Sequence, residues 1–102
     1  GPTYERNIMS MKPIIESFRD NGEQRLYRFD NGYGASVIRN SYSYGGDKGL
    51  FELAVVKYHN ADNDAWGLCY DTPITDDVIG RLTEAEVQAL LEQIKALPAK
   101  ED

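Results

Sequence analysis

The sequence predicts an α+β domain in which an antiparallel sheet of four to five strands, a meander with Asn-Gly hairpins, packs against a C-terminal amphipathic helix. Three observations lead to this fold class. Asn-Gly pairs at 21–22 and 31–32 separate short apolar segments, and this dipeptide suits tight hairpin turns. Residues 50–58 form the most strand-like segment of the chain. Apolar residues in the last part of the chain recur at helical spacing.

The predicted meander uses the segments 14–20 and 24–30 and a third strand that ends at Ile38. Turns of only two residues set these pairs opposite one another: Phe18 and Arg25, Tyr27 and Ser36, Phe29 and Gly34. The alternation of side chains then divides the apolar residues between two faces of the sheet. One face carries Ile14, Phe18, Tyr27, Phe29 and Ile38, and the other carries Ile15, Leu26, Ala35 and Val37. Either face suits the core.

The second half of the chain supplies two more strands and the helix. The segment 50–58 is apolar on both faces near its end, which favours a central position, and 66–70 reads as a short fifth strand. Thr83 and Glu86 form the pattern of a helix capping box. Apolar residues repeat along 87–97, and Pro98 marks the end of the helix. A short turn, capped by Thr75 and ended by Gly80, precedes this helix.

The size and charge of the chain limit its classes of function. A chain of 102 residues has room for one domain, which we place at 14–98, between a tag remnant and flexible N-terminus at 1–13 and a flexible C-terminus at 99–102. The net charge of −6 opposes direct binding of nucleic acid. Cys69 is the only cysteine, which favours a cytoplasmic protein without disulfides. No apolar run is long enough to cross a membrane.

The sequence offers few candidates for catalytic or metal sites. His59 is the only histidine, and a dyad with Cys69, oriented by Asp62, Asp64 or Asp71, is the one nucleophilic arrangement available. The acidic residues lack the spacing of a calcium loop, and no cluster of cysteine and histidine suits zinc. The glycine-rich stretch 45–49 leads into a strand, unlike a phosphate-binding loop. We therefore expect no cofactor, no metal and no enzymatic activity.

Tyrosine is the residue type in excess, with 7 in the chain. Tyr33, Tyr42 and Tyr44 lie in or beside glycine-rich turns, and exposed tyrosines in loops are typical of recognition surfaces. Lys48 follows in the same glycine-rich region. These four residues are the predicted binding site, either for a partner protein or for a nucleotide-like ligand whose base stacks on the rings. The alternative is that tyrosine simply suits strands and half-buried sheet edges.

Three segments resemble a family of small bacteriophage proteins of unknown function, especially from phages that infect actinobacteria. They are Asn31–Val37, Gly45–Val55 and Tyr70–Gly80, and the resemblance extends over most of 14–98. It implies a phage protein in the host cell cytoplasm that binds a host or defence protein, in host takeover or counter-defence, and it assigns no functional residue. The leading hypothesis is a non-enzymatic binding protein. A small-ligand sponge and a small Cys/His enzyme are the alternatives, and a homo-oligomer is left open.

Overall fold

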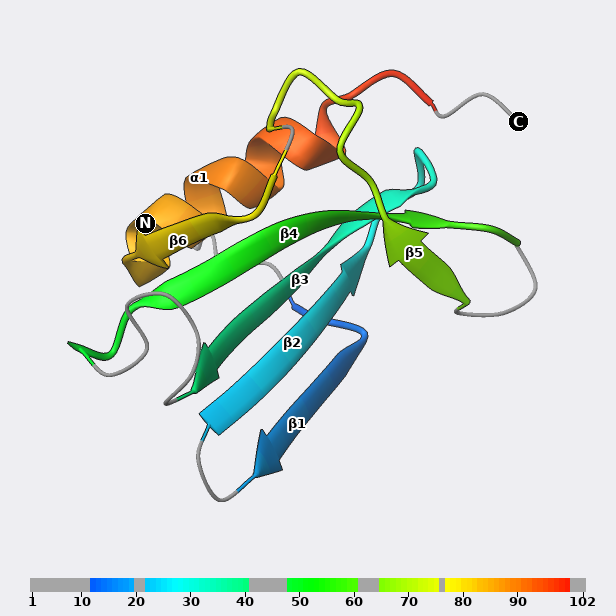
Figure 1. Cartoon of the computed structure of the whole chain (residues 1–102). Coiled ribbons are helices and arrows are strands. Elements are labelled where there is room, and N and C mark those ends of the chain that lie inside the picture. Colours follow the sequence, from blue (N-terminus) through cyan, green and yellow to red (C-terminus); the bar gives the residue numbers. More distant parts are fainter. Residues whose placement is uncertain (1–11, 20–21, 41–47, 61–64, 76, 100–102) are drawn as a thin grey trace, which may run out of the picture.

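The computed structural model describes residues 12–19, 22–40, 48–60, 65–75 and 77–99 (Figure 1). These ranges form one antiparallel sheet with an α-helix on one side, so the predicted fold class is confirmed. The elements are β1 (Ile15–Arg19), β2 (Gly22–Arg28), β3 (Tyr33–Asn40), β4 (Phe51–Tyr58), β5 (Trp66–Leu68), β6 (Ile79–Leu82) and α1 (Glu84–Lys95). The strands follow the order β1-β2-β3-β4-β5, and β6 also pairs with β4.

Strand β6 is an element that the sequence pattern does not predict. Gly80, expected to end a capped turn, lies inside this strand. The turn at Thr75 does form, because the Thr75 hydroxyl accepts a hydrogen bond from the Asp77 backbone N–H at 3.1 Å. Strand β4 therefore has two short neighbours, with β6 beside its first residues and β5 beside its last residues.

Both hairpins pair in a register that differs from the prediction. Phe18 lies opposite Glu23 instead of Arg25, because Gly22 belongs to β2 and pairs with Arg19. The second loop contains the three residues 30–32 instead of two. The Phe29 N–H donates to the Tyr33 carbonyl at 2.8 Å, and Gly32 has a φ of 89°. This is the three-residue hairpin in which a glycine in the left-handed region follows a turn.

The change of register also changes which residues share a face of the sheet. Tyr27 lies opposite Ala35 instead of Ser36, and a shift of one residue moves side chains to the other face. The core combines Tyr27, Ala35 and Val37 with residues of β4, β6 and α1, whereas Ile38 lies on the other face. The predicted division of the apolar residues holds for β1 and β2, where Ile15 and Leu26 share a face, and is wrong for β3, because Ala35 and Val37 lie with Tyr27.

Helix α1 begins as the sequence predicts. The Thr83 hydroxyl accepts a hydrogen bond from the Glu86 N–H at 3.2 Å, and the Glu86 carboxylate accepts one from the Thr83 N–H at 2.8 Å. These two bonds are the capping box. The helix buries Val87, Leu91 and Ile94 against the sheet. No helix in the described ranges is long and apolar enough to span a membrane.

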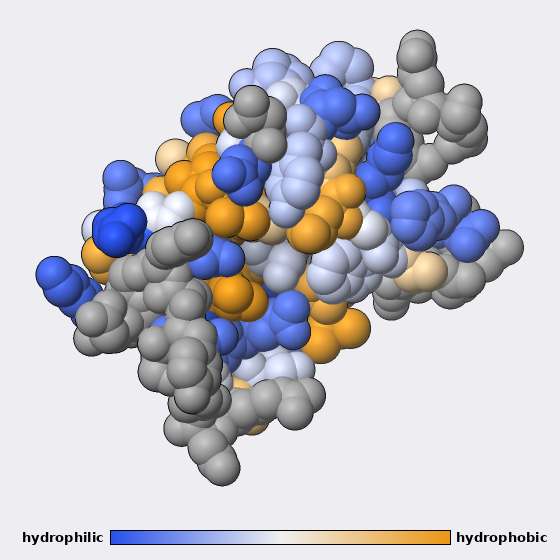
Figure 2. Space-filling view, in the orientation of Figure 1, coloured by the Kyte–Doolittle hydropathy of each residue, from blue (hydrophilic) through white to orange (hydrophobic). Residues whose placement is uncertain are grey.

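Helix α1 covers only part of the sheet. It packs on β3, β4 and β6, whereas β1 lies at the margin of the sheet far from it (Figure 1). The face turned away from α1, here called the open face, carries Ile15, Leu26, Ile38, Ala54 and Leu68. In the orientation of Figure 1, apolar residues reach the surface in several places (Figure 2).

Candidate functional site

The structure does not bring the described members of the predicted tyrosine site together. Tyr33 opens β3 and packs half-buried against the core. Lys48 is exposed near the other end of β3, where the neighbouring Gly49 carbonyl accepts a hydrogen bond from Arg39. From the rise of a strand, the length of β3 separates them by roughly 25 Å. Tyr42 and Tyr44 lie outside the described residues, so their role stays a prediction.

Cys69 lacks the surroundings of an activated nucleophile. Its buried thiol donates a hydrogen bond to an Asp71 carboxylate oxygen at 2.8 Å. Burial and this hydrogen bond raise the pKa of Cys69, whereas a reactive cysteine needs a lowered pKa. His59 is exposed and lies beside Gly67. Asp62 and Asp64 lie outside the described residues, and the described ones contain no group of three metal-ligating side chains.

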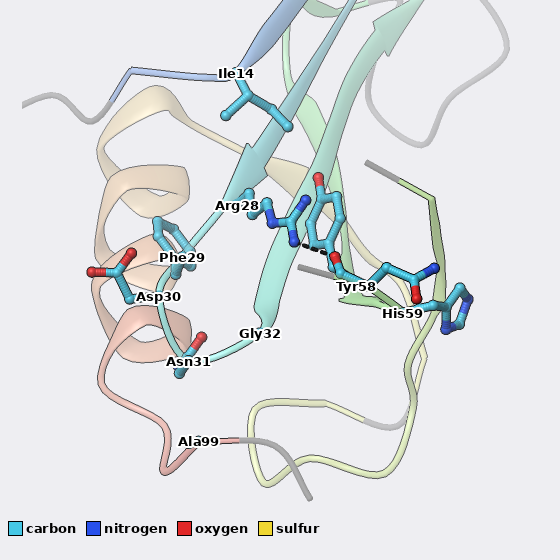
Figure 3. Close-up of a pocket in the computed structure, with 10 residues that line it drawn as sticks. Ile14, Arg28, Phe29, Asp30, Asn31, Gly32, Tyr58, His59 and Ala99 are labelled. Carbon is cyan, nitrogen blue, oxygen red and sulfur yellow. Dashed lines mark hydrogen bonds between the residues drawn. The ribbon is translucent and has the colours of Figure 1, made fainter. Parts of the chain in front are cut away.

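A cleft of about 580 Å³ opens beside the β2–β3 loop, at the end of β4 (Figure 3). The Arg28 guanidinium lies 4.6 Å from the centre of the Tyr58 ring and donates a hydrogen bond to the Asn60 carbonyl. Phe29 and His59 line the cleft as well. A cation among aromatic side chains can hold a small anionic or aromatic ligand.

Asn31 borders this cleft and has a structural role that its place in an Asn-Gly pair does not reveal. Its side-chain amide donates to the backbone carbonyls of Ile94 at 2.9 Å, Lys95 at 3.2 Å and Leu97 at 3.0 Å. Its carbonyl oxygen accepts the Tyr33 N–H at 3.0 Å. These acceptors are at the C-terminus of α1, where carbonyls lack partners inside the helix. Asn31 therefore ties the β2–β3 loop to the end of α1.

Strand β1 and the preceding Ile14 present apolar side chains at an edge of the sheet. Phe18 is 70% exposed, and Ile14 and Ile15 are each 44% exposed. In the part of the chain that the structure describes, no strand pairs with the outer side of β1. Such an edge is a ready template for another strand, because its backbone N–H and C=O groups point outward. This feature was not predicted, because it depends on which strand ends the sheet.

A network of charged side chains lies on the helix side of the sheet next to β1. Arg25 binds both carboxylate oxygens of Glu84, at 3.0 and 2.8 Å, and one oxygen of Glu23 at 3.1 Å. The bond to Arg25 lowers the pKa of Glu84. Glu23 also accepts from Arg39 at 2.5 Å. Glu16 lies farther away, at 3.8 Å from Arg25, and its side chain is 43% exposed.

Comparison with known proteins gives no family for this chain. No family model matches the sequence, and no curated protein and no solved structure is similar to it. A functional proposal therefore depends on the residues of the chain and on their arrangement.

Proposed function

We propose that the chain is a non-enzymatic binding protein that engages a partner protein through β1. The supporting observation is the exposure of an apolar edge strand, in which Phe18 is 70% exposed. An uncovered apolar edge pairs indiscriminately with other strands unless charge, shortness or a partner blocks it. A partner seated on β1 would cover Phe18, Ile14 and Ile15 together.

The class of partner follows from the resemblance to small phage proteins. Proteins of that kind act inside a bacterial cell, so a host or defence protein is the expected partner. The geometry at Cys69 favours binding over the Cys/His enzyme, because a thiol that donates to Asp71 and has a raised pKa is a poor nucleophile.

The experiment compares capture of partners by the wild type and by two matched variants. Phe18→Ser removes the exposed aromatic ring from β1, and Leu68→Ser removes an exposed apolar side chain, 55% exposed, from β5. Both variants should keep the wild-type circular dichroism spectrum and melting temperature, because both side chains are largely in solvent. We expect a bacterial protein to be captured by the wild type and by Leu68→Ser but not by Phe18→Ser. Equal capture by all three proteins would contradict the proposal.

A second candidate function is the binding of a nucleotide-like ligand in the cleft beside Arg28. The observation in its favour is a guanidinium 4.6 Å from the centre of the Tyr58 ring, in a cleft that Phe29 also lines. A panel of linear and cyclic nucleotides tests it by thermal shift, since a ligand at 100 times its Kd stabilises a protein by about 2.7 kcal/mol. The expected shift disappears in Arg28→Met and persists in Lys48→Met. No shift with any nucleotide would contradict this function.

A further inference from the structure

We infer that the segment bound by β1 is an extended strand that places a lysine or arginine opposite Glu16 and apolar residues opposite Ile15 and Phe18. This inference rests on the proposed function and adds the chemistry of the partner. Strand addition supplies backbone hydrogen bonds to any sequence, so the side chains of the edge determine which segment is preferred.

The two faces of the sheet give the partner strand its alternation. Ile15 pairs with Leu26 and therefore lies on the open face, whereas Phe18 pairs with Glu23 and lies on the helix side. Helix α1 packs on β3, β4 and β6, so the side chain of Phe18 stays 70% exposed. An added strand would place apolar side chains next to Ile15 on one face and next to Phe18 on the other.

The charges beside β1 favour a cation at the position between these two contacts. Three carboxylates, from Glu16, Glu23 and Glu84, share the guanidinium groups of Arg25 and Arg39. Among the described residues of this network, three negative and two positive charges leave one negative charge in excess. Glu16 is the carboxylate of this network on the edge strand, at 3.8 Å from Arg25 and 43% exposed. A cation directly opposite Glu16 would complement that charge.

A second copy of the chain is a poorer occupant of the same edge. Two β1 strands that pair antiparallel around Glu16 place Phe18 opposite Ile14 of the other copy, which is a favourable apolar contact. The same register places the two Glu16 carboxylates directly opposite each other, where like charges repel. In this register Glu16 opposes self-pairing and favours a strand of the opposite charge.

These conditions define a short pattern for an antiparallel partner. Read from its N-terminus, the partner segment has an apolar residue opposite Phe18, serine or threonine opposite Ser17, lysine or arginine opposite Glu16, and an apolar residue opposite Ile15. Capped peptides with the core Val-Thr-Lys-Val fit this pattern. Peptides with Val-Thr-Glu-Val differ from them only in the charge opposite Glu16 and are the matched control.

The test titrates each peptide into the isotope-labelled full chain and follows the backbone amides by NMR. We expect the lysine peptide to shift the amides of β1 and to bind about threefold or more tightly than the glutamate peptide, which is the size of a cross-strand charge effect. Glu16→Lys should reverse this preference. Phe18→Ser should weaken both peptides, and Leu68→Ser should change neither affinity.

Three results with the peptides would overturn the inference. They are equal binding of the two peptides, shifts confined to residues outside β1, and failure of the lysine peptide to bind at millimolar concentration. Association of the chain with itself that Phe18→Ser abolishes would also overturn it, because the occupant would then be a second copy. Capture of a bacterial protein that depends on Phe18, together with no preference between the peptides, would leave the proposed function standing and reject only the strand chemistry.

Discussion

Gly34→Ala is expected to destabilise the protein strongly, because there is no space for a methyl group at this position. A Cβ atom at Gly34 would lie 1.9 Å from the Tyr27 carbonyl oxygen and 2.8 Å from a carbon of the Tyr58 ring. The hydroxyl of Tyr58 donates to that same carbonyl at 3.1 Å. Forced overpacking costs about 1–3 kcal/mol, and loss of the hydrogen bond adds about 1 kcal/mol. We therefore expect a loss of about 2–4 kcal/mol in the free energy of unfolding.

Urea unfolding and thermal melting measure this loss, with two controls that separate its causes. For a domain of this size the melting temperature should fall by roughly 10–25 °C. Tyr58→Phe removes only the hydroxyl and should cost about 1 kcal/mol. Gly49→Ala has no atom within 4 Å of the new Cβ, and its positive φ costs about 1–2 kcal/mol. A Gly34→Ala variant less destabilised than both controls would refute the steric reasoning.

Two further substitutions test how α1 is attached to the sheet. Asn31→Asp should lower the free energy of unfolding by about 1 kcal/mol more than Asn31→Ala. The reason is that a carboxylate would face the carbonyls at the C-terminus of α1 and be repelled by the helix dipole. Equal losses of the two variants in urea unfolding would contradict this. Arg25 lowers the pKa of Glu84 from its ordinary value of 4.5. The ion pair between Arg25 and Glu84 therefore stabilises the folded state above pH 4.5, and this stabilisation is lost as the pH falls through the lower pKa that Glu84 has in the folded state. Melting temperatures measured from pH 7 downward should therefore fall more steeply for the wild type than for Glu84→Gln, and parallel curves would show that this ion pair contributes nothing.

Except for β6, the elements of the fold were predictable from local sequence, whereas the register between the strands was not. Thr83 and Glu86 specify the start of α1 by hydrogen bonds within four residues, which sequence shows directly. The loop after β2 depends on whether Asp30 joins the turn, and the Asn-Gly pair is compatible with either loop length. The difference of one residue in loop length places Ala35 opposite Tyr27. The side chains of β3 therefore lie on the opposite faces of the sheet from those that a two-residue loop predicts.

The candidate site was harder to predict because its features depend on contacts distant in sequence. Asn31 was interpreted as a turn residue, but its amide binds carbonyls that follow it by 63 to 66 residues. Phe18 was placed in a strand correctly, yet its exposure depends on where α1 packs. No local pattern indicates that the helix covers β3 and β4 and leaves β1 uncovered.

The position of the core makes β1 suitable for binding a partner. The buried cluster draws on β2, β3, β4, β6 and α1 and includes no residue of β1. The side chains of β1 therefore contribute little to the core, while pairing with β2 along five residues holds the strand in an extended conformation. A strand that is already extended spends less conformational entropy on binding than a segment that must first become ordered. Phe18 and Glu16 thus lie on a preorganised edge, where apolar contact would supply affinity and the exposed carboxylate of Glu16 would supply the choice of partner.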